Sequence, residues 1–247
     1  MSNYSGVLKI IRFNWPWYAA AVALTLGMLL CLFLNLPSRI NTVLVVGALV
    51  ISSLWMLLSL AVSHYVYDRS SVGRGTWLSK LVPSNACRGA IFHAGQDEVS
   101  PAVARQFPTL DFQVFDFYDE RRNGTDSLRR ARALNQHRDL SVKSDEIPVA
   151  DSAFDLALVV FAAHEIRDES QRTAFFREIR RVLTPSGRLI VAEHLRDSWN
   201  FIAYGPGAFH FLSERTWRRS FASAELKILR ETNCTRFVRV FELQKNG

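Results

Sequence analysis

Two pairs of adjacent residues that can accept a proton follow apolar runs in the second half of the chain. His164 and Glu165 come shortly after one run, and Glu193 and His194 end the next. Histidine titrates near neutrality, so His164 or His194 is the natural general base, and Glu165 is the third candidate. Each of these residues could instead orient a loop or pair with a nearby arginine. We find no metal-ligand spacing and no nucleophile triad, so we predict no metal site.

The elements that position these residues read as a strand, a helix and a second strand. Residues 154–161 are an apolar run of strand length, which predicts a buried parallel strand. Asp168 and Gln171 have the spacing of a helix cap, and apolar residues then recur at helical spacing. A turn at residues 184–187 ends the helix, and residues 188–192 start the next strand. This order predicts a parallel sheet with a right-handed crossover, whose ligands bind beyond the carboxyl ends of the strands.

This stretch resembles the second half of a class I S-adenosylmethionine-dependent methyltransferase, of the type 11 kind. The family's fourth strand commonly reads sFDlv, and its next helix and turn read lrEi.RvLkPGGrl. The matching residues are Ser152, Phe154, Asp155, Arg177-Glu178-Ile179, Arg181-Val182-Leu183, Pro185, Gly187 and Arg188-Leu189. The resemblance covers about residues 85–245. It implies S-adenosylmethionine as cofactor and an α/β, Rossmann-like sheet that is mostly parallel with an antiparallel last strand. Residues 227–232 and 236–243 are expected to form the final hairpin.

The resemblance also implies a cofactor site in the first half of the domain. The family's glycine positions fall on His93, Gly95 and Asp97, of which only Gly95 keeps the pattern. The carboxylate that holds the cofactor ribose aligns with Asp116, at the end of a strand predicted at residues 112–115; a plain strand-end turn residue is the alternative. The implied cofactor-binding residues are His93, Ala94, Gly95, Asp116, Asp145 and Phe161.

Two uncharged runs, residues 15–36 and 40–62, precede this domain. Each has the roughly 20 residues that cross a bilayer core, and only Pro37, Ser38 and Arg39 separate them. So short a connection predicts an antiparallel transmembrane hairpin. The alternatives are a cleaved signal peptide for the first run, or a hairpin buried in a soluble domain.

Charge is unevenly distributed along the chain. Residues 1–66 hold three of the 30 basic residues and none of the 23 acidic ones, which leaves the remainder a net charge of +4. Basic residues flank the hairpin on its outer ends, while only Arg39 lies in its loop, so the positive-inside rule places both termini and the domain in the cytosol, at an inner or plasma membrane. Anionic headgroups are therefore a better partner for the basic surface than nucleic acid. The three cysteines are dispersed, which indicates reduced thiols.

We expect three parts: a hairpin at residues 1–67, a juxtamembrane linker or helix at 68–87, and a methyltransferase-like domain at 88–247. The apolar patch of the linker, around Trp77 and Leu78, belongs to the first helix of the domain or to a segment on the lipid surface, and we favour a mixture of the two. Residues 118–140 predict an arginine-rich amphipathic helix. Residues 199–216 predict a loop and helix that cap the pocket, with Tyr204, His210 and Phe211 facing substrate.

The leading hypothesis is a membrane-anchored methyltransferase acting on a lipophilic small molecule, because an enzyme with a soluble substrate gains little from two membrane spans. A quinone precursor, a polyene or aromatic-lipid phenol, or a phospholipid headgroup would fit. The rival is a methyltransferase-like protein that has lost catalysis and acts as a membrane scaffold or partner subunit, and the altered glycine loop favours it. A nucleic-acid or protein methyltransferase is disfavoured, because residues 161–164 read FAAH where an Asn/Asp-Pro-Pro-Tyr motif would stand.

Overall fold

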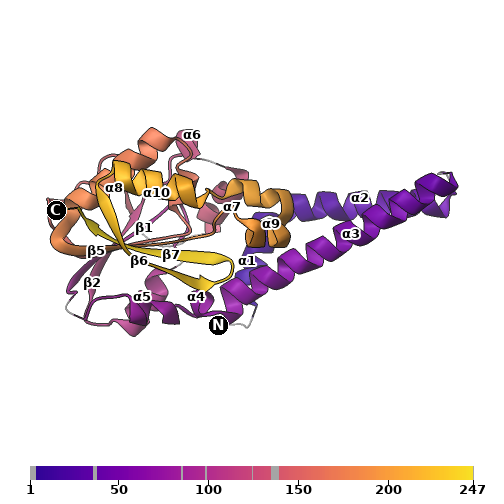
Figure 1. The fold of residues 1–247 in the computed structure, drawn as a ribbon. Helices are drawn as coiled ribbons and strands as arrows, with labels where there is room; N and C mark the ends of the chain where they lie inside the picture. The colour runs from indigo at the N-terminus through magenta and orange to yellow at the C-terminus, as the bar shows by residue number, and fades with distance from the viewer. Residues whose placement is uncertain are drawn as a thin grey trace.

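A computed structural model describes residues 4–35, 38–84, 86–97, 99–123, 125–134 and 139–246. Its strands form one seven-stranded sheet in the order β3-β2-β1-β4-β5-β7-β6 (Figure 1). The first five strands pair in parallel, and β7 runs antiparallel to both β5 and β6. This confirms the expected fold class and the final hairpin. The strands are β1 (Arg88–His93), β2 (Asp111–Asp116), β3 (Leu140–Ser141), β4 (Phe154–Val160), β5 (Leu183–Glu193), β6 (Leu226–Thr235) and β7 (Val238–Lys245).

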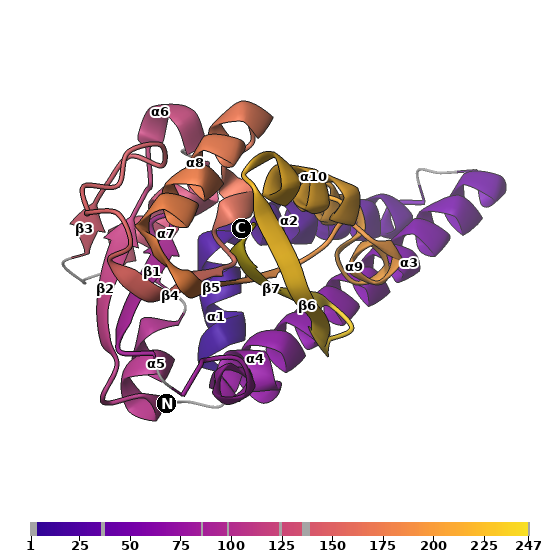
Figure 2. The ribbon, with the colours of Figure 1, turned by 60° about the vertical axis from the view of Figure 1, so that its left-hand side comes forward.

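Helices cover both faces of the sheet, which is why β4 is apolar at every position but one. Side chains alternate along a strand, so Ala157 and Val159 join one core and Leu156 and Leu158 the other. Figures 1 and 2 show α8 and α10 on one face, and α4 and α5 on the other. These helices are α4 (Ser71–Arg74), α5 (Ser100–Gln106), α8 (Glu169–Val182) and α10 (Glu214–Ser223).

The helix α8 begins where its sequence predicts. The carboxylate of Asp168 accepts the backbone N–H of Gln171 at 2.8 Å, which confirms the expected cap. The expected turn at residues 184–187 is wrong, since these residues belong to β5. There β5 advances from Leu183 to Arg188 while its partner β4 advances only from Phe154 to Leu156. The Thr-Pro-Ser-Gly segment is thus absorbed as an irregularity in the pairing of the two strands.

The arginine-rich stretch after β2 forms two helices rather than one, α6 (Glu120–Asn123) and α7 (Asp126–Leu134), and residues 135–138 lie outside the described residues. The chain closes this half of the sheet with the short β3. The ribbon then crosses back to β4, so the strand order reverses between β1 and β4. Ligands of such sheets bind at that reversal, beyond the carboxyl ends of the strands.

Two long helices project from the domain side by side, α2 (Trp15–Phe33) and α3 (Arg39–His64) (Figures 1 and 2). Both are long and apolar enough to cross a membrane by length and composition, and 0% and 6% of their most apolar windows are buried. That exposure contradicts the alternative of a hairpin buried in a soluble core. A short amphipathic helix that we did not predict, α1 (Ser5–Phe13), precedes them.

The segment after α3 ties the hairpin to the domain through η1 (Tyr65–Arg69), α4 and η2 (Thr76–Lys80). Asp68 accepts the backbone N–H groups of Gly6 and Val7 at 2.5 and 3.0 Å, which fastens α1 to this junction. Trp77 and Leu78 are buried in the core beneath the sheet. This burial contradicts the lipid-surface alternative for these two side chains.

Candidate active site

Glu193 organises the carboxyl ends of β4 and β5. Its side chain is fully buried and accepts three hydrogen bonds, from the backbone N–H of Ala162 (3.1 Å), the backbone N–H of His164 (3.3 Å) and the His164 ring Nδ1 (2.7 Å). These bonds fix the turn η3 (Ala163–Glu165) against β5. One buried carboxylate thus sets both the backbone and the ring of the residue that the sequence singled out as a base.

The proton of His164 is held rather than exchanged at neutral pH. Burial opposes its charged form, but the carboxylates of Glu193 and Glu165 outweigh burial and raise the pKa of His164 to about 10. Because Nδ1 donates to Glu193, Nε2 is the nitrogen turned to Glu165, 3.4 Å from Oε1. A histidine that is already protonated is a donor, so it orients Glu165 rather than accepting a proton.

Glu165 carries the accepting oxygen of this cluster. Burial favours its neutral form, yet hydrogen bonds from His164 and His210 hold the pKa of Glu165 well below its usual range. Its Oε1 lies 3.3 Å from His210 Nε2, while Oε2 is buried and has no hydrogen-bond partner among the described residues. A buried acceptor without a partner is costly unless a ligand supplies the donor.

His164, Glu165 and His210 offer three ligand atoms within 4.8 Å of one another, a grouping that sequence spacing did not reveal. The guanidinium of Arg167 already lies against this group, with Nη2 2.9 Å from His210 Nε2 and Nη1 donating to the His210 carbonyl. A metal ion would have to displace that cation. The charged His164 and Arg167 already balance the carboxylates of Glu165 and Glu193, so we assign no metal here.

The ring of Phe211 contacts both His164 and His194. Both ring nitrogens of His194 have hydrogen-bond partners. Nδ1 is 2.8 Å from the carbonyl of Phe237, and Nε2 is 3.0 Å from the hydroxyl of Tyr67. Burial lowers the pKa of His194 to about 4. A neutral imidazole with two partners favours a structural role, in which His194, directly after β5, bonds the juxtamembrane Tyr67.

Aromatic rings surround His194 on both sides. Phe161 stacks on it at a centroid distance of 5.0 Å, and Phe211 stacks on the other face at 4.8 Å. Phe161 has φ +50°, a conformation that costs a bulky residue about 1–2 kcal/mol. It lines a small cavity of about 90 Å³ next to Tyr67 and α1. Tyr204 packs edge-on against His194 and Phe211, and burial raises its pKa. Of the three expected substrate residues, His210 and Phe211 therefore lie beside the His164 cluster, and Tyr204 lies behind them.

Three of the expected cofactor residues, His93, Gly95 and Asp116, lie at the carboxyl ends of β1 and β2, where other residues of the chain already bond to them. Gly95 has φ +80°, which glycine adopts without strain, and its N–H donates to Asp116 at 2.7 Å. Asp116 is buried. Its carboxylate also accepts a hydrogen bond from the Tyr118 N–H and forms an ion pair with Arg132. His93 is buried beside them and bonds Asp139 at 3.0 Å through Nε2. Here the chain's own donors fill the positions around the carboxylate.

A cavity of about 350 Å³ lies next to this region, at the ends of β2, β3 and β4. Asp145 is exposed in the turn beside it, next to Ser144 of the cavity wall. Sequence reasoning did not identify the wall of this cavity. Its lining residues are Phe117, Tyr118, Asp119, Glu120, Ser141, Val142, Lys143, Ser144, Ile166 and Gln171.

Comparison with known proteins agrees with this fold. Residues 123–191 match the family model of a methyltransferase domain. The uncharacterized protein YafE of Escherichia coli K12 is 29% identical over 126 residues, which are 47% of this chain and 56% of that protein. The chain thus spans about half the length of the curated relative that it matches.

Solved structures show the same sheet. The mitomycin 7-O-methyltransferase MmcR is similar with a TM-score of 0.57 at 17% identity, over 99% of this chain and 73% of that one. A SAM-dependent methyltransferase from Aquifex aeolicus gives 0.54 at 16% identity, over 72% and 89%. The chain therefore has the fold of S-adenosylmethionine-dependent methyltransferases. With the domain match, this supports a methyltransferase that has S-adenosylmethionine as cofactor.

In this conformation the residues at β1 and β2 do not fit the cofactor as the resemblance implies. A Cβ on Gly95 would lie 3.3 Å from Arg132 Cβ and 3.4 Å from the Tyr118 ring, so side chains already pack over the loop. The Asp116 carboxylate that would meet the ribose hydroxyls is paired with Arg132. The Arg132 side chain itself is 38% exposed, which leaves its guanidinium room to swing toward solvent.

Proposed function

We propose that this methyltransferase is anchored in a membrane and methylates a lipophilic small molecule that reaches it from the bilayer. One segment carries the proposal, α9 (Ser198–Tyr204) with η4 (Gly205–His210). On one side, the carbonyl of Ile202 accepts the indole N–H of Trp55 on α3 at 2.8 Å. On the other, His210 lies 3.3 Å from Glu165. The same short segment thus joins the apolar hairpin to the acidic and histidine cluster.

Within this proposal, Glu165 accepts a hydrogen bond from the hydroxyl or amine of the methyl acceptor and positions that group for methylation. Its Oε2 is the acceptor without a partner among the described residues, and it lies in a site from which bulk water is largely excluded. Protonated His164 orients Glu165, and Glu193 orients His164 through Nδ1. The aromatic ring of Phe211, next to His164, offers a flat apolar surface to a quinone-like or phenolic substrate.

The proposed orientation puts both termini and the domain on the cytosolic side of an inner or plasma membrane. Lys9 and Arg12 precede the hairpin and Arg69 and Arg74 follow it, whereas only Arg39 lies in its loop. α1, which carries Lys9 and Arg12, is fastened to the junction through Asp68. Its basic residues would then face anionic headgroups next to the domain.

The test is methyl transfer in lipid nanodiscs. Full-length protein would receive S-adenosylmethionine with a radioactive methyl group together with a total lipid extract, and label in the organic phase would be counted. We expect Glu165→Gln to lower the rate by about 10²-fold, the usual loss when a reacting group is no longer positioned. Glu169→Gln, an exposed carboxylate four residues further along the chain, is the matched control and should keep the wild-type rate. An unchanged rate in Glu165→Gln, or label only in water-soluble acceptors, would reject the proposal.

The second candidate is a methyltransferase-like membrane scaffold or partner subunit without catalysis. The observation that favours it is the pairing of Asp116 with Arg132, together with His93 and Asp97 at two of the glycine positions. The two candidates differ in whether S-adenosylmethionine binds at all, and a titration separates them directly.

A further inference from the structure

The outer side of α9 and η4 is apolar where a water-soluble helix would be polar. Phe209 and Ile202 are 63% and 54% exposed, and Trp199 and Phe201 are exposed as well. The polar Asn200 is instead fully buried, where its amide donates to the Phe237 carbonyl at 3.1 Å. A soluble amphipathic helix turns its apolar face to the core, whereas here apolar side chains face outward and a polar one faces the core.

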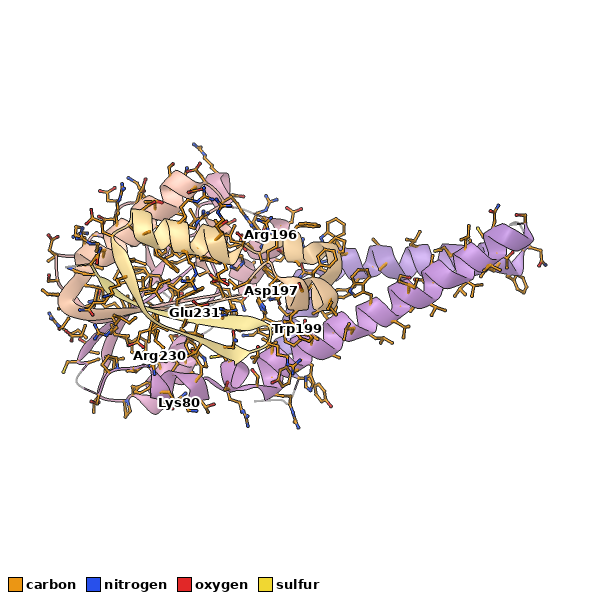
Figure 3. All side chains as sticks on the ribbon, viewed as in Figure 1. Lys80, Arg196, Asp197, Trp199, Arg230 and Glu231 are labelled. Atoms are coloured by element: carbon orange, nitrogen blue, oxygen red, sulfur yellow. The ribbon has the colours of Figure 1, made fainter. Side chains whose placement is uncertain are left out.

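This segment is also free of charged side chains. Residues 198–213 contain no Asp, Glu, Lys or Arg, while Arg196, Asp197, Glu214 and Arg215 flank them directly. Arg236 lies over the ring of Trp199 at 4.8 Å. Figure 3 shows Trp199 at the end of the domain from which the hairpin projects, next to α3. An indole at the border between an apolar face and basic side chains is typical of a membrane interface.

The depth of this segment follows from its contact with α3. Trp55 donates to the Ile202 carbonyl, its ring meets Phe201 edge-on at 6.5 Å, and Gly205 packs against the indole. Trp55 stands seven residues before Val62, where the uncharged run ends, so it lies roughly 10 Å inside that run along the helix axis. If α3 spans the bilayer, α9 and η4 cannot remain in bulk water.

We propose that α9 and η4 form an in-plane membrane element, with Trp199, Phe201, Ile202 and Phe209 embedded in the headgroup and acyl boundary of the leaflet next to the domain. The inference rests on the proposed membrane anchoring. Interfacial helices bury their apolar face about 5–10 Å deep, which matches the level of Trp55. Since His210 is the last residue of η4 and Phe211 follows it, a lipophilic acceptor would pass from this boundary into the His164 cluster without crossing water.

Site-directed spin labelling tests the inference in full-length protein reconstituted in nanodiscs of phosphatidylcholine and phosphatidylglycerol. The three native cysteines would be replaced by serine, and single cysteines introduced as Phe209→Cys and, as a second position, Ile202→Cys. Val50→Cys, exposed at mid-α3, is the reference for lipid, and Leu229→Cys, exposed on β6, is the reference for water. Oxygen collides preferentially with labels in lipid, and a water-soluble nickel chelate with labels in water.

We expect labels at positions 209 and 202 to collide with oxygen more than with nickel, at a depth of about 5–10 Å and shallower than position 50. If both report water while position 50 reports lipid, the hairpin is anchored and the in-plane element is wrong. If both are shielded from both reagents, a protein contact covers this face, and the inference is wrong again. If position 50 reports water, the membrane anchoring itself fails.

Discussion

The two halves of the sheet's carboxyl edge differ in how their buried carboxylates are used. At β4 and β5, Glu193 accepts three hydrogen bonds that fix His164, and the neighbouring Glu165 keeps one oxygen without a partner among the described residues. At β1 and β2, Asp116 is also buried, but Gly95, Tyr118 and Arg132 supply its donors. One half leaves an acceptor for a ligand, and the other has satisfied its own.

The half of the site whose neighbouring sequence resembles the family has an acceptor left for a ligand. The half whose sequence departs from the family has none. The half that keeps the family's residues forms a preorganised cluster at the end of β4. The half that departs from them, with His93 and Asp97 at glycine positions, packs side chains over the loop. Because Arg132 is partly exposed, this packing can open, whereas the Glu193 network cannot open without unfolding of the core.

The largest expected effect concerns the half of the site at β4 and β5, which Glu193 organises. Glu193→Ala removes the acceptor of two buried backbone N–H groups and of the His164 ring, so we expect a loss of about 3–5 kcal/mol in the free energy of unfolding. Denaturant unfolding of the detergent-purified chain, followed by circular dichroism, measures it. Glu225→Ala, whose exposed side chain pairs with Arg180, should cost about 0–1 kcal/mol. Equal losses in the two variants would show that Glu193 does not organise this end of the sheet.

The pH dependence of stability tests the same half. The pKa of His164 is raised to about 10 in the fold, so its contribution is present below its unfolded pKa of about 6.5 and is lost as pH rises toward 10. The pKa of His194 is lowered to about 4, so its contribution is present above about 6.5 and is lost as pH falls toward 4.

We therefore expect a stability maximum near pH 6–7, with each arm on the order of 2 kcal/mol. Unfolding midpoints between pH 5 and pH 9 measure both arms. His164→Gln should flatten the alkaline arm alone, and His194→Gln the acidic arm alone, so each variant is the control of the other. A wild-type profile without an alkaline decline would contradict a charged His164.

The smallest expected effect concerns the other half. Arg132→Ala removes the guanidinium that competes with a ligand for Asp116, so we expect S-adenosylmethionine to bind about 3–10-fold more tightly, or up to about 1.4 kcal/mol. Arg129→Ala, on the same helix but paired with the exposed Asp126 and Glu120, is the matched control and should leave the dissociation constant unchanged. Weaker binding in Arg132→Ala would mean that Arg132 holds the ligand rather than excluding it.

The sequence predicts the fold well because the signals for it are local. The apolar run of β4, the cap at Asp168 and the alternation in β7 each decide an element from a few neighbouring residues. The turn expected at residues 184–187 failed because the pairing between β5 and β4 took up these residues, and pairing depends on a distant strand.

The site was less predictable, because its chemistry depends on pairs that are far apart in the chain. His164 and His194 look alike in sequence, yet the carboxylates of Glu193 and Glu165 keep the first charged, and burial keeps the second neutral. The closure of Asp116 by Arg132 leaves no signal in either residue's neighbours. Likewise, residues 199–216 predict a loop and helix that cap the pocket, and only the contact with Trp55 indicates what the exposed side chains of α9 and η4 face.

The central claim is a working methyltransferase, and isothermal titration of S-adenosylmethionine and S-adenosylhomocysteine into the detergent-purified full-length chain tests it most directly. We predict saturable binding of both ligands in the wild type, and its loss in Asp116→Ala. No binding of either ligand to the wild type or to Arg132→Ala, by protein whose cooperative unfolding shows that it is folded, would contradict the claim and favour the scaffold.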